Sequence, residues 1–247
     1  MIISVVVPNL NEEKSLPYFL DSLRRQKYRD YELVVVDGGS SDRSRSIIDG
    51  YRFFFPVTGL INNTRHIAFV RNFGATCARG ELLLFTNSDA VFPEWLLMEI
   101  AFYFKMDPNL QALSGRTVPY NGGFLCFAGY YCFDLIRAFM ARRLGKFSPS
   151  GNFLVIKTDL FWTLGGFPNA KINEDGTLGH MISEHCSVYG GKAVFDFGMW
   201  AGHFAKRWKN PLKTLFFYSY VFGNFNQVLK RILAPLEKNS GEVFSRK

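Results

Sequence analysis

The stretch ELLLFTNSDAVFPEWLL, residues 81–97, ends a hydrophobic run in a small polar cluster that could hold a divalent cation. Asp89 is the candidate ligand, because Mg²⁺ and Mn²⁺ prefer oxygen ligands and often take one or two protein carboxylates beside substrate phosphates. Asn87 could add a neutral carbonyl oxygen or bind a ribose hydroxyl, and His203 could complete the site as a neutral imidazole. The simpler alternatives are that Asp89 caps the following helix and that His203 is structural.

Two further polar clusters follow hydrophobic runs near the start of the chain. Asn9–Glu12 comes after the run IISVVVP, and Asp37 comes after YELVVV and precedes two glycines. The Asp37 carboxylate could accept a hydrogen bond from the N–H of a uracil-like base or from a ribose hydroxyl, and Gly39 would let the backbone approach that ligand closely. The alternative for Asp37 is a helix cap or a turn residue.

A pair of carboxylates, Glu174 and Asp175, opens a predicted helix after the glycines at 165 and 166. Because carboxylates are stabilised at helix N-termini, the pair could serve as caps. Alternatively, one of them could act as a general base that deprotonates an acceptor hydroxyl as it attacks. Arg71, which follows the predicted third strand, could contact a phosphate or a base, or could pair with a surface acid.

These side chains need strands and helices to position them. In the first half we predict strands at 2–8, 31–37, 66–70 and 81–85, and helices at 13–26 and 71–79. Short connections between alternating strands and helices indicate a parallel sheet with right-handed crossovers. Ligands bind beyond the carboxyl ends of such strands, and all three polar clusters lie there. In the second half we predict strands at 112–119, 151–157 and 192–197, and helices at 124–143, at 158–164 and from 174.

In order and spacing, these segments resemble the GT-A glycosyltransferases of family 2 over about residues 1–203. SVVVPNLNEE is similar to the family's opening strand, and ELVVVDGGSSD to its second-strand signature. VRNFGATCARGELLLFTNSDA is similar to the stretch that leads into the family's Asp-x-Asp metal motif, and GGFPNAKINEDGTLGHMI to its acceptor-side segment. At the first acidic position of Asp-x-Asp this chain has Asn87, so the expected metal site carries less negative charge.

The resemblance implies an α/β fold of the GT-A type, with a Rossmann-like, mostly parallel central sheet flanked by helices and a C-terminal amphipathic helical extension. The glycosyltransferase domain would cover 1–203, with a nucleotide-binding half at 1–110 and an acceptor-binding half at 111–203, and a basic, aromatic-rich helical tail would cover 204–247. The implied activity is inverting transfer of a sugar from a UDP- or GDP-sugar to a hydroxyl or phosphate acceptor by direct displacement, with Mn²⁺ or Mg²⁺ as cofactor.

The resemblance also implies roles for the residues singled out above. Asp175 would be the catalytic base, with Glu174 as the second choice. Asp89 would hold the metal on the diphosphate, with His203 as a further candidate ligand. The nucleotide would be bound by residues at the strand tips, namely Pro8, Asn9, Asn11, Glu12, Asp37, Gly39, Arg71, Asn87 and Ser88.

The positive charge is concentrated at the C-terminal end. Of the net charge of +8, residues 203–247 contribute +7, with nine Lys and Arg against two Glu. An apolar stripe from Leu215 to Leu236 predicts an amphipathic helix, which could pack on the core or lie on an anionic membrane. Its apolar run is too short to span a bilayer. The predicted helix at 124–143 is also rich in aromatic residues, but Asp134 and Arg137 interrupt it.

These two surfaces suggest a carbohydrate or lipid-linked acceptor, such as a polyprenyl or dolichyl phosphate or a saccharide built on one, and peripheral contact with an anionic membrane. The N-terminal stretch MIISVVVP lacks the basic flank and cleavage site of a signal peptide. We therefore expect a cytoplasmic protein at the cytoplasmic face of the membrane.

Other functions fit less of the sequence. A catalytically silent GT-A scaffold that binds nucleotide or a partner would account for Asn87, but not for Asp89 and the Glu174–Asp175 pair. A sugar nucleotidyltransferase would carry a Gly-rich basic loop after the first strand, and PNLNEEKS is not one. No nucleic-acid partner is expected, because the chain outside the tail is close to neutral.

Overall fold

A computed structural model describes residues 1–62, 66–120, 123–169 and 173–204 of the chain. The predicted tail helix and its basic residues lie outside this described part. The strands are β1 (Ile3–Asn9), β2 (Tyr31–Asp37), β3 (Val57–Ile61), β4 (Leu82–Phe85), β5 (Ala90–Val91), β6 (Leu110–Pro119), β7 (Leu154–Lys157) and β8 (Lys192–His203). The helices are α1 (Leu16–Arg24), α2 (Ser44–Gly50), α3 (Ile67–Thr76), α4 (Leu96–Met106), α5 (Phe124–Leu144), α6 (Thr158–Thr163) and α7 (Glu174–Tyr189).

One sheet connects all of these strands, in the order β3-β2-β1-β4-β7-β6-β8-β5. The pairs β1–β2, β2–β3, β1–β4 and β6–β8 are parallel, whereas β7 runs antiparallel to both of its neighbours and β5 is antiparallel to β8. The mostly parallel α/β sheet is therefore as predicted. Because β2, β1 and β4 are adjacent and parallel, their carboxyl ends lie side by side at the same end of the strands.

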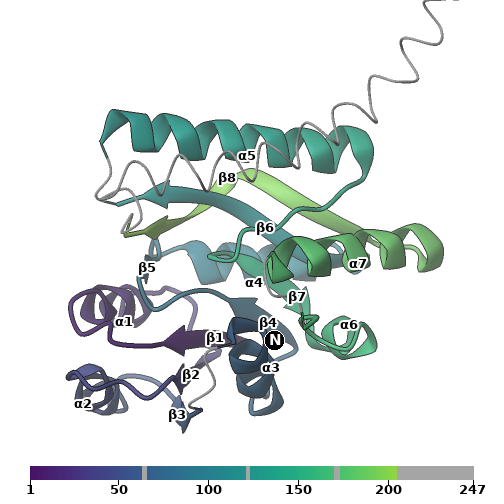
Figure 1. The fold of residues 1–247 in the computed structure, drawn as a ribbon. Coiled ribbons are helices and arrows are strands. Elements are labelled where there is room, and N and C mark those ends of the chain that lie inside the picture. Colours follow the sequence, from purple (N-terminus) through teal and green to yellow (C-terminus); the bar gives the residue numbers. More distant parts are fainter. Residues whose placement is uncertain (63–65, 121–122, 170–172, 205–247) are drawn as a thin grey trace, which may run out of the picture. The chain divides into compact units, whose positions relative to one another are not determined.

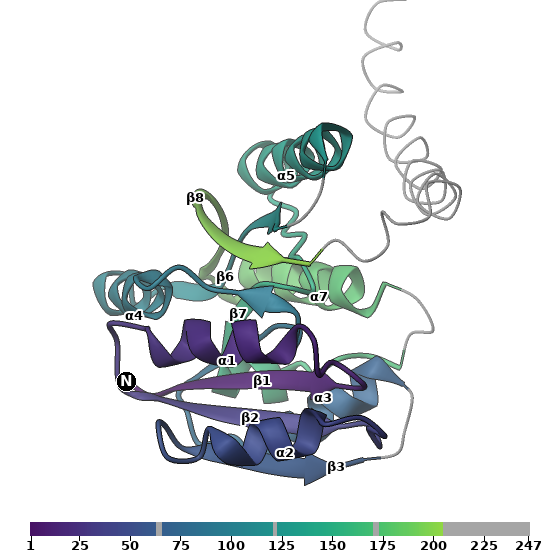
Figure 2. The ribbon, with the colours of Figure 1, turned by 90° about the vertical axis from the view of Figure 1, so that its left-hand side faces the viewer.

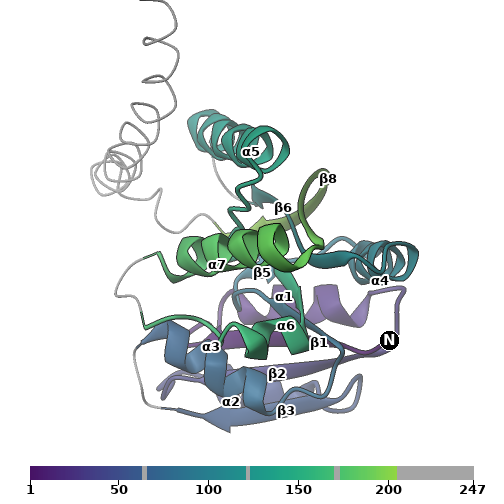
Figure 3. The ribbon, with the colours of Figure 1, turned by 90° about the vertical axis from the view of Figure 1, so that its right-hand side faces the viewer.

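β1 illustrates why the strands are continuous apolar runs. Val5 and Val7 belong to one hydrophobic core, which includes residues of α1 and α4, and Val6 belongs to a second core with residues of α3, α6 and α7. Successive side chains of a strand point to opposite faces, so a sheet covered on both faces needs apolar residues at every position. Figures 2 and 3 show α1, α2 and α4 on one face of the sheet, and α3, α6 and α7 on the other.

The prediction of a strand at 66–70 is wrong, whereas the helix predicted at 71–79 is confirmed for residues 71–76. Helix α3 begins at Ile67, and the third strand is β3, which precedes it. A short apolar run does not by itself distinguish a strand from a buried helix. The run at 67–76 buries Ala68, Arg71 and Ala75, which are spaced as one face of a helix. The true strand is a partly exposed edge strand with a glycine at its centre, and such a strand has a weak sequence signal.

Strand β8 extends further than the predicted 192–197 and ends at His203. It pairs in parallel with β6, and a register shift after Gly115 lets the pairing continue as far as Pro119 and His203. The end of β8 then pairs with β5, which places His203 opposite Ala90. The sheet thus curls until the end of β8 lies beside the residue that follows Asp89.

Helix α5 packs against β6 and β8, and it runs along them in Figure 1. Its inner face carries Asp134, whose carboxylate is buried and accepts hydrogen bonds from Thr117 N over 3.2 Å and from Arg137 Nη1 over 3.1 Å. Burial raises the pKa of Asp134 to about 6, and Arg137 and the Thr117 N–H limit that rise. The acid that interrupts the α5 sequence therefore faces β6.

Candidate active site

The last residues of β1 and β2, Asn9 and Asp37, are paired in register and hydrogen-bonded to each other. Asn9 Nδ2 donates to Asp37 Oδ2 over 2.8 Å, as does Ser40 Oγ over 2.6 Å, and Arg45 Nε donates to Asp37 Oδ1 over 2.9 Å. Burial alone would raise the pKa of Asp37, but the hydrogen bonds from Ser40, Asn9 and Arg45 outweigh it and hold this pKa below its ordinary value. Asp37 is therefore a stably charged group at the strand tip.

Asp37 organises the turn that follows it, which is one of the two roles that its sequence position allowed. Its Oδ1 also accepts a hydrogen bond from Gly39 N over 3.1 Å, and Gly39 has a φ of 92°, which glycine adopts without strain. Arg45, whose side chain is 46% exposed, is the donor that a ligand could replace. Asn9 Oδ1 is buried without a hydrogen-bond partner in the described structure, and it could accept one from a bound nucleotide.

The loop after β1 contacts the loop after β2. Asn11, with a φ of 54°, donates its backbone N–H to Ser40 Oγ over 2.9 Å and accepts the N–H of Ser41 at its Oδ1, also over 2.9 Å. The backbone N–H of Glu12 donates to Ser44 Oγ over 3.0 Å. Asn9, Asn11, Glu12, Asp37 and Gly39, all predicted nucleotide ligands, therefore lie together. Binding of nucleotide by these residues stays a prediction.

Arg71 on α3 joins two motifs that lie about a hundred residues apart in sequence. Its side chain is 3% exposed, and its Nη1 is 2.6 Å from Asp175 Oδ1 and 3.3 Å from Glu174 Oε1, at the first turn of α7. Its Nη2 donates to Gly151 O over 3.0 Å and lies 3.4 Å from Asn87 Oδ1. Arg71 thus pairs with acids, as in one of the predicted alternatives. These acids are the two candidate bases, and they are partly exposed although Arg71 itself is buried.

Asn87 is held from a second direction by the turn before β7. Its Nδ2 donates to Asn152 Oδ1, and Thr86 Oγ1 donates to Asn152 O over 2.9 Å. The amide at 87 therefore both accepts from Arg71 and donates to Asn152, which a carboxylate could not do. The asparagine fits its surroundings in this chain. Of the other predicted nucleotide ligands, Ser88 is buried in the next turn and Pro8 is half-buried in β1.

Sequence reasoning missed the residues that support Arg71. Its guanidinium lies 5.1 Å from the ring centroid of Phe167, within the range of a cation–π contact. The neighbouring Asn72 holds the backbone of Phe167 by two hydrogen bonds, from Nδ2 to Phe167 O over 2.9 Å and from Phe167 N to Oδ1 over 2.8 Å. Gly151 leaves room for Asp175, because a Cβ atom at Gly151 would overlap the Oδ2 of Asp175. No local sequence pattern could have indicated these contacts, because they join residues that lie about 80 to 95 positions apart in the chain.

Asp89 and His203 lie next to each other because β5 pairs with the end of β8. His203 Nδ1 is 3.5 Å from Asp89 Oδ1, and the backbone N–H of Phe204 donates to Asp89 O over 3.2 Å. On its other side, the His203 ring is 5.9 Å from the ring of Tyr130 on α5. The two predicted metal ligands are therefore brought together, although they are more than a hundred residues apart in sequence.

The donor set fits a divalent cation that shares its coordination with a ligand. One carboxylate and one imidazole can bind Mn²⁺ or Mg²⁺ when diphosphate oxygens or waters complete the coordination sphere. Among the described residues, no group of three or more His, Cys, Asp and Glu side chains forms a full protein cage. In the described structure, His203 Nδ1 is buried and has no hydrogen-bond partner, which leaves a lone pair or an N–H available.

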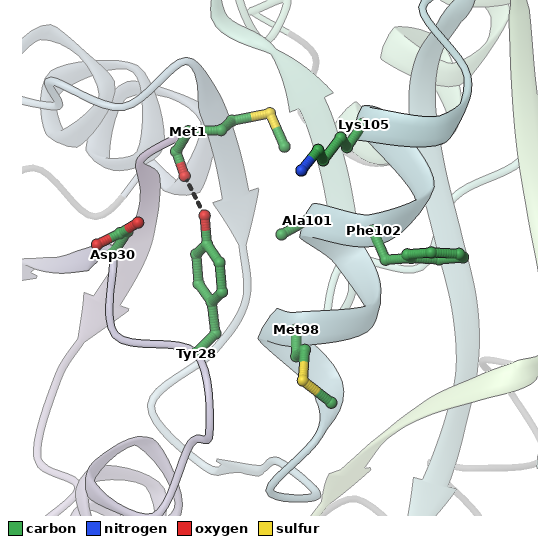
Figure 4. A pocket seen from close by; sticks show the side chains of 7 residues that line it. All are labelled: Met1, Tyr28, Asp30, Met98, Ala101, Phe102 and Lys105. Atoms are coloured by element: carbon green, nitrogen blue, oxygen red, sulfur yellow. Dashed lines mark hydrogen bonds between the residues drawn. The ribbon is translucent and has the colours of Figure 1, made fainter.

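A pocket of about 570 Å³ lies elsewhere, between the start of β1 and α4 (Figure 4). Tyr28 Oη donates to Met1 O over 2.5 Å at one wall, and Met98 and Phe102 line the other. Because Met1 precedes the N-terminal end of β1, the pocket lies at the opposite edge of the sheet from Asn9. None of the predicted site residues lines it, so we assign the chemistry to the strand tips and not to this pocket.

Comparison with known proteins now identifies the family. The sequence model of "Glycosyl transferase family 2" matches residues 4–164. The chain belongs to glycosyl transferase family 2. The predicted family is thus confirmed, and the match includes the strand tips, Arg71 and the segment from Asn87 to Asp89.

Curated relatives of this family 2 chain are glycosyltransferases by name. It is 26% identical over 175 residues to an uncharacterized glycosyltransferase of Haemophilus influenzae, covering 68% of this chain and 57% of the relative. It is 27% identical over 192 residues to glycosyltransferase GlyG of Streptococcus pneumoniae, covering 72% and 64%. The chain therefore spans roughly three-fifths of the length of these two relatives.

Solved structures confirm the GT-A type of fold. The Staphylococcus aureus TarS fragment 1–349 in complex with UDP-GlcNAc superposes with a TM-score of 0.67 at 21% identity, over 83% of this chain and 59% of that one. The mannosyltransferase PcManGT from Pyrobaculum calidifontis, in complex with GDP-Man and Mn²⁺, gives a TM-score of 0.65 at 23% identity, over 81% and 56%. In the part of this chain that the structure describes, no helix has the length and hydropathy that spanning a bilayer requires.

Proposed function

We propose that this chain is an inverting glycosyltransferase that moves a sugar from a nucleotide-diphosphate donor to a hydroxyl or phosphate acceptor. The observation that carries the proposal is the Arg71 cluster, in which the candidate base Asp175 lies in contact with Arg71 Nη1 and Asn87 with Arg71 Nη2. Membership of family 2 and relatives whose printed names are glycosyltransferases support it. UDP-GlcNAc in TarS and GDP-Man in PcManGT make UDP- and GDP-sugars the donor classes to test.

In the proposed reaction, Asp175 acts as the general base. Its carboxylate accepts the proton of the acceptor hydroxyl while the acceptor oxygen attacks the anomeric carbon. The bond from that carbon to the diphosphate oxygen breaks, and its electron pair leaves with the nucleoside diphosphate. Attack from the face opposite the leaving group inverts the anomeric centre. About 22% of the Asp175 side chain is exposed, so an acceptor can reach it, and Arg71 fixes its orientation.

Asp89 and His203 would hold Mn²⁺ or Mg²⁺ on the donor diphosphate, and the cation would neutralise the charge that builds on the leaving group. We expect Asp89→Asn to keep the fold and to lower sugar transfer by about 10²-fold or more, because a neutral amide binds the cation weakly. His203→Gln should raise the Mn²⁺ concentration for half-maximal binding roughly ten-fold. Titration of Mn²⁺ by electron paramagnetic resonance, beside turnover, measures both effects.

His180→Gln is the matched control for this experiment, because His180 lies exposed on α7 and pairs with Glu184. It should leave the Mn²⁺ titration unchanged. Turnover of Asp89→Asn near that of the parent protein at saturating Mn²⁺ would remove Asp89 from the metal site.

A second variant tests whether Asp175 must lie where Gly151 leaves room for it. Gly151→Ala should displace the Asp175 carboxylate and lower the turnover number by about 10²-fold, since a misplacement of about 1 Å can cost that much. Overpacking should lower the free energy of unfolding by about 1–3 kcal/mol. Gly50→Ala is the control, because a Cβ atom there has no neighbour within 4 Å. Equal turnover of the two variants would contradict the assigned position of the base.

The decisive experiment is a screen of UDP- and GDP-sugars for release of nucleoside diphosphate with Mn²⁺ or Mg²⁺. Turnover of one donor would support an enzyme. The rival is a catalytically silent scaffold, favoured by Asn87 at the first position of the metal motif. Donor binding by calorimetry without turnover of any donor, with and without candidate acceptors, would favour that scaffold.

Lipid-linked saccharides and polyprenyl phosphates belong in the acceptor panel, because the basic C-terminal segment and the aromatic α5 suit a membrane-bound substrate.

A further inference from the structure

The outer face of α5 carries large apolar side chains that contact solvent. Their exposed fractions lie between 44% and 84%, in a helix whose inner face packs on β6 and β8. We call these residues the α5 stripe, and they are Phe124, Phe127, Tyr131, Leu135 and Phe139. Their spacing of three and four residues puts them on a single face. Scattered exposed hydrophobic residues are ordinary, but a continuous row along about four turns indicates a surface that something covers.

Acidic residues are absent from this exposed face. The sequence of α5 contains a single acid, Asp134, and the structure buries it against β6, where Thr117 N and Arg137 are its partners. The sequence position of Asp134 suggested that it interrupts the aromatic row. Because its side chain is buried, it does not interrupt the stripe on the exposed face. A carboxylate at this face would be repelled by anionic headgroups, and α5 presents none.

Cations follow the stripe at the end of α5. Arg142, Arg143 and Lys146 are exposed there, and Gly145, with a φ of 60°, caps the helix after Leu144. Cations near a helix C-terminus are favoured by the helix dipole in any case. Next to an aromatic row, however, they give the composition of a helix that lies in a membrane interface, with rings at the headgroup level and cations on anionic lipids. The positive charge at the end of α5 therefore favours an anionic lipid surface as the partner that covers the stripe.

The stripe is also close to the candidate site. Tyr130, on the inner side of the same helix, lies with its ring 5.9 Å from that of His203. A bilayer on the outer face of α5 would thus be separated from the proposed metal ligands by the thickness of one helix. We propose that the α5 stripe docks on an anionic lipid bilayer, and that the acceptor, in line with the proposed function, is attached to a lipid of that membrane.

The test is flotation of the full chain with vesicles of phosphatidylcholine and phosphatidylglycerol in a two-to-one ratio, and with phosphatidylcholine alone. The double variant Phe127→Ser/Phe139→Ser should reduce the fraction bound to anionic vesicles at least about ten-fold, because two apolar side chains no longer enter the interface. The triple variant Arg142→Gln/Arg143→Gln/Lys146→Gln should show a similar loss with anionic vesicles and little change with neutral ones.

A matched control comes from α4, which also exposes Phe102 and Met106 but is followed by Asp107. Phe102→Ser/Met106→Ser should float like the parent protein. Circular dichroism of each variant checks that the fold is retained. If the α5 double variant floats as well as the parent protein, the proposal is wrong, and residues 205–247 carry any membrane binding.

Two further outcomes separate this proposal from its alternatives. If the parent protein is a dimer in sedimentation and the α5 variant is a monomer with unchanged flotation, the stripe binds a second copy of the chain and the proposal is overturned. Activity distinguishes the proposal from the proposed function. If the α5 variant no longer floats but transfers sugar to a water-soluble acceptor at the parental rate, membrane docking by the stripe is supported. If the parent protein floats but turns over no donor, the proposed enzymatic function is contradicted and membrane docking is not.

Discussion

Asp175→Asn is expected to lower sugar transfer by about 10²–10⁴-fold while the fold is retained, because the amide cannot accept the proton of the acceptor. The substitution preserves the shape of the side chain, and its Oδ1 can still accept a hydrogen bond from Arg71, which contacts that atom at 2.6 Å. Donor binding should therefore change little, and the loss should appear in the turnover number. Release of nucleoside diphosphate with and without acceptor, together with thermal unfolding, measures this.

Glu174→Gln is the control for the base, because Glu174 contacts the same Arg71 nitrogen at the longer distance of 3.3 Å. Its turnover should fall much less. A larger loss in Glu174→Gln than in Asp175→Asn would exchange the two roles. Near-parental turnover in both variants would exclude this pair as the source of the base.

Arg71→Met should lower both stability and turnover more than any other single change in the cluster. It leaves two carboxylates, only 14% and 22% exposed, without their cation, and removing one member of a buried ion pair costs about 3–5 kcal/mol. It also removes the contact with the Phe167 ring. Denaturant unfolding should show the loss of stability, and kinetics with saturating donor should show the loss of turnover.

Two companion variants separate charge from geometry in this experiment. Arg71→Lys keeps the charge but not the planar fork that reaches Asp175, Asn87 and Gly151 together, so stability should recover more than turnover. The double variant Arg71→Met/Asp175→Asn should be more stable than Arg71→Met alone, because one uncompensated charge is gone. Strict additivity of the two substitutions would mean that the ion pair contributes nothing.

The first strands and the polar residues at their tips could be predicted from sequence because the determining features are local. Buried strands such as β1 and β2 are continuous apolar runs, and each ends at a polar residue, Asn9 or Asp37. The run at 66–70 was misassigned because four or five apolar residues fit a strand and one face of a helix equally well. Edge strand β3, half-exposed and interrupted by Gly59, gave no such run.

The contacts that complete the candidate site could not be predicted, because they join segments that only the tertiary fold brings together. Nothing local to Arg71 indicates that it contacts Asp175. Gly151 contributes a backbone carbonyl and the absence of a side chain, and Asn152 contributes a side-chain amide. His203 was proposed as a metal ligand, but the strand that positions it was expected to end at 197. The register shift after Gly115 that prolongs β8 has no simple sequence pattern.

Arg71 and Asn72 also limit how the molecule can move. These two neighbours on α3, in the first half of the chain, form hydrogen bonds with Gly151, Phe167 and Asp175 in the second half. Strand β4 of the first half is also paired with β7 of the second half. The two halves cannot hinge apart as lobes without breaking a buried ion pair and a sheet. If the chain binds a nucleotide sugar as proposed, we expect residues 1–204 to keep their arrangement, so small-angle scattering should give the same radius of gyration with and without nucleotide.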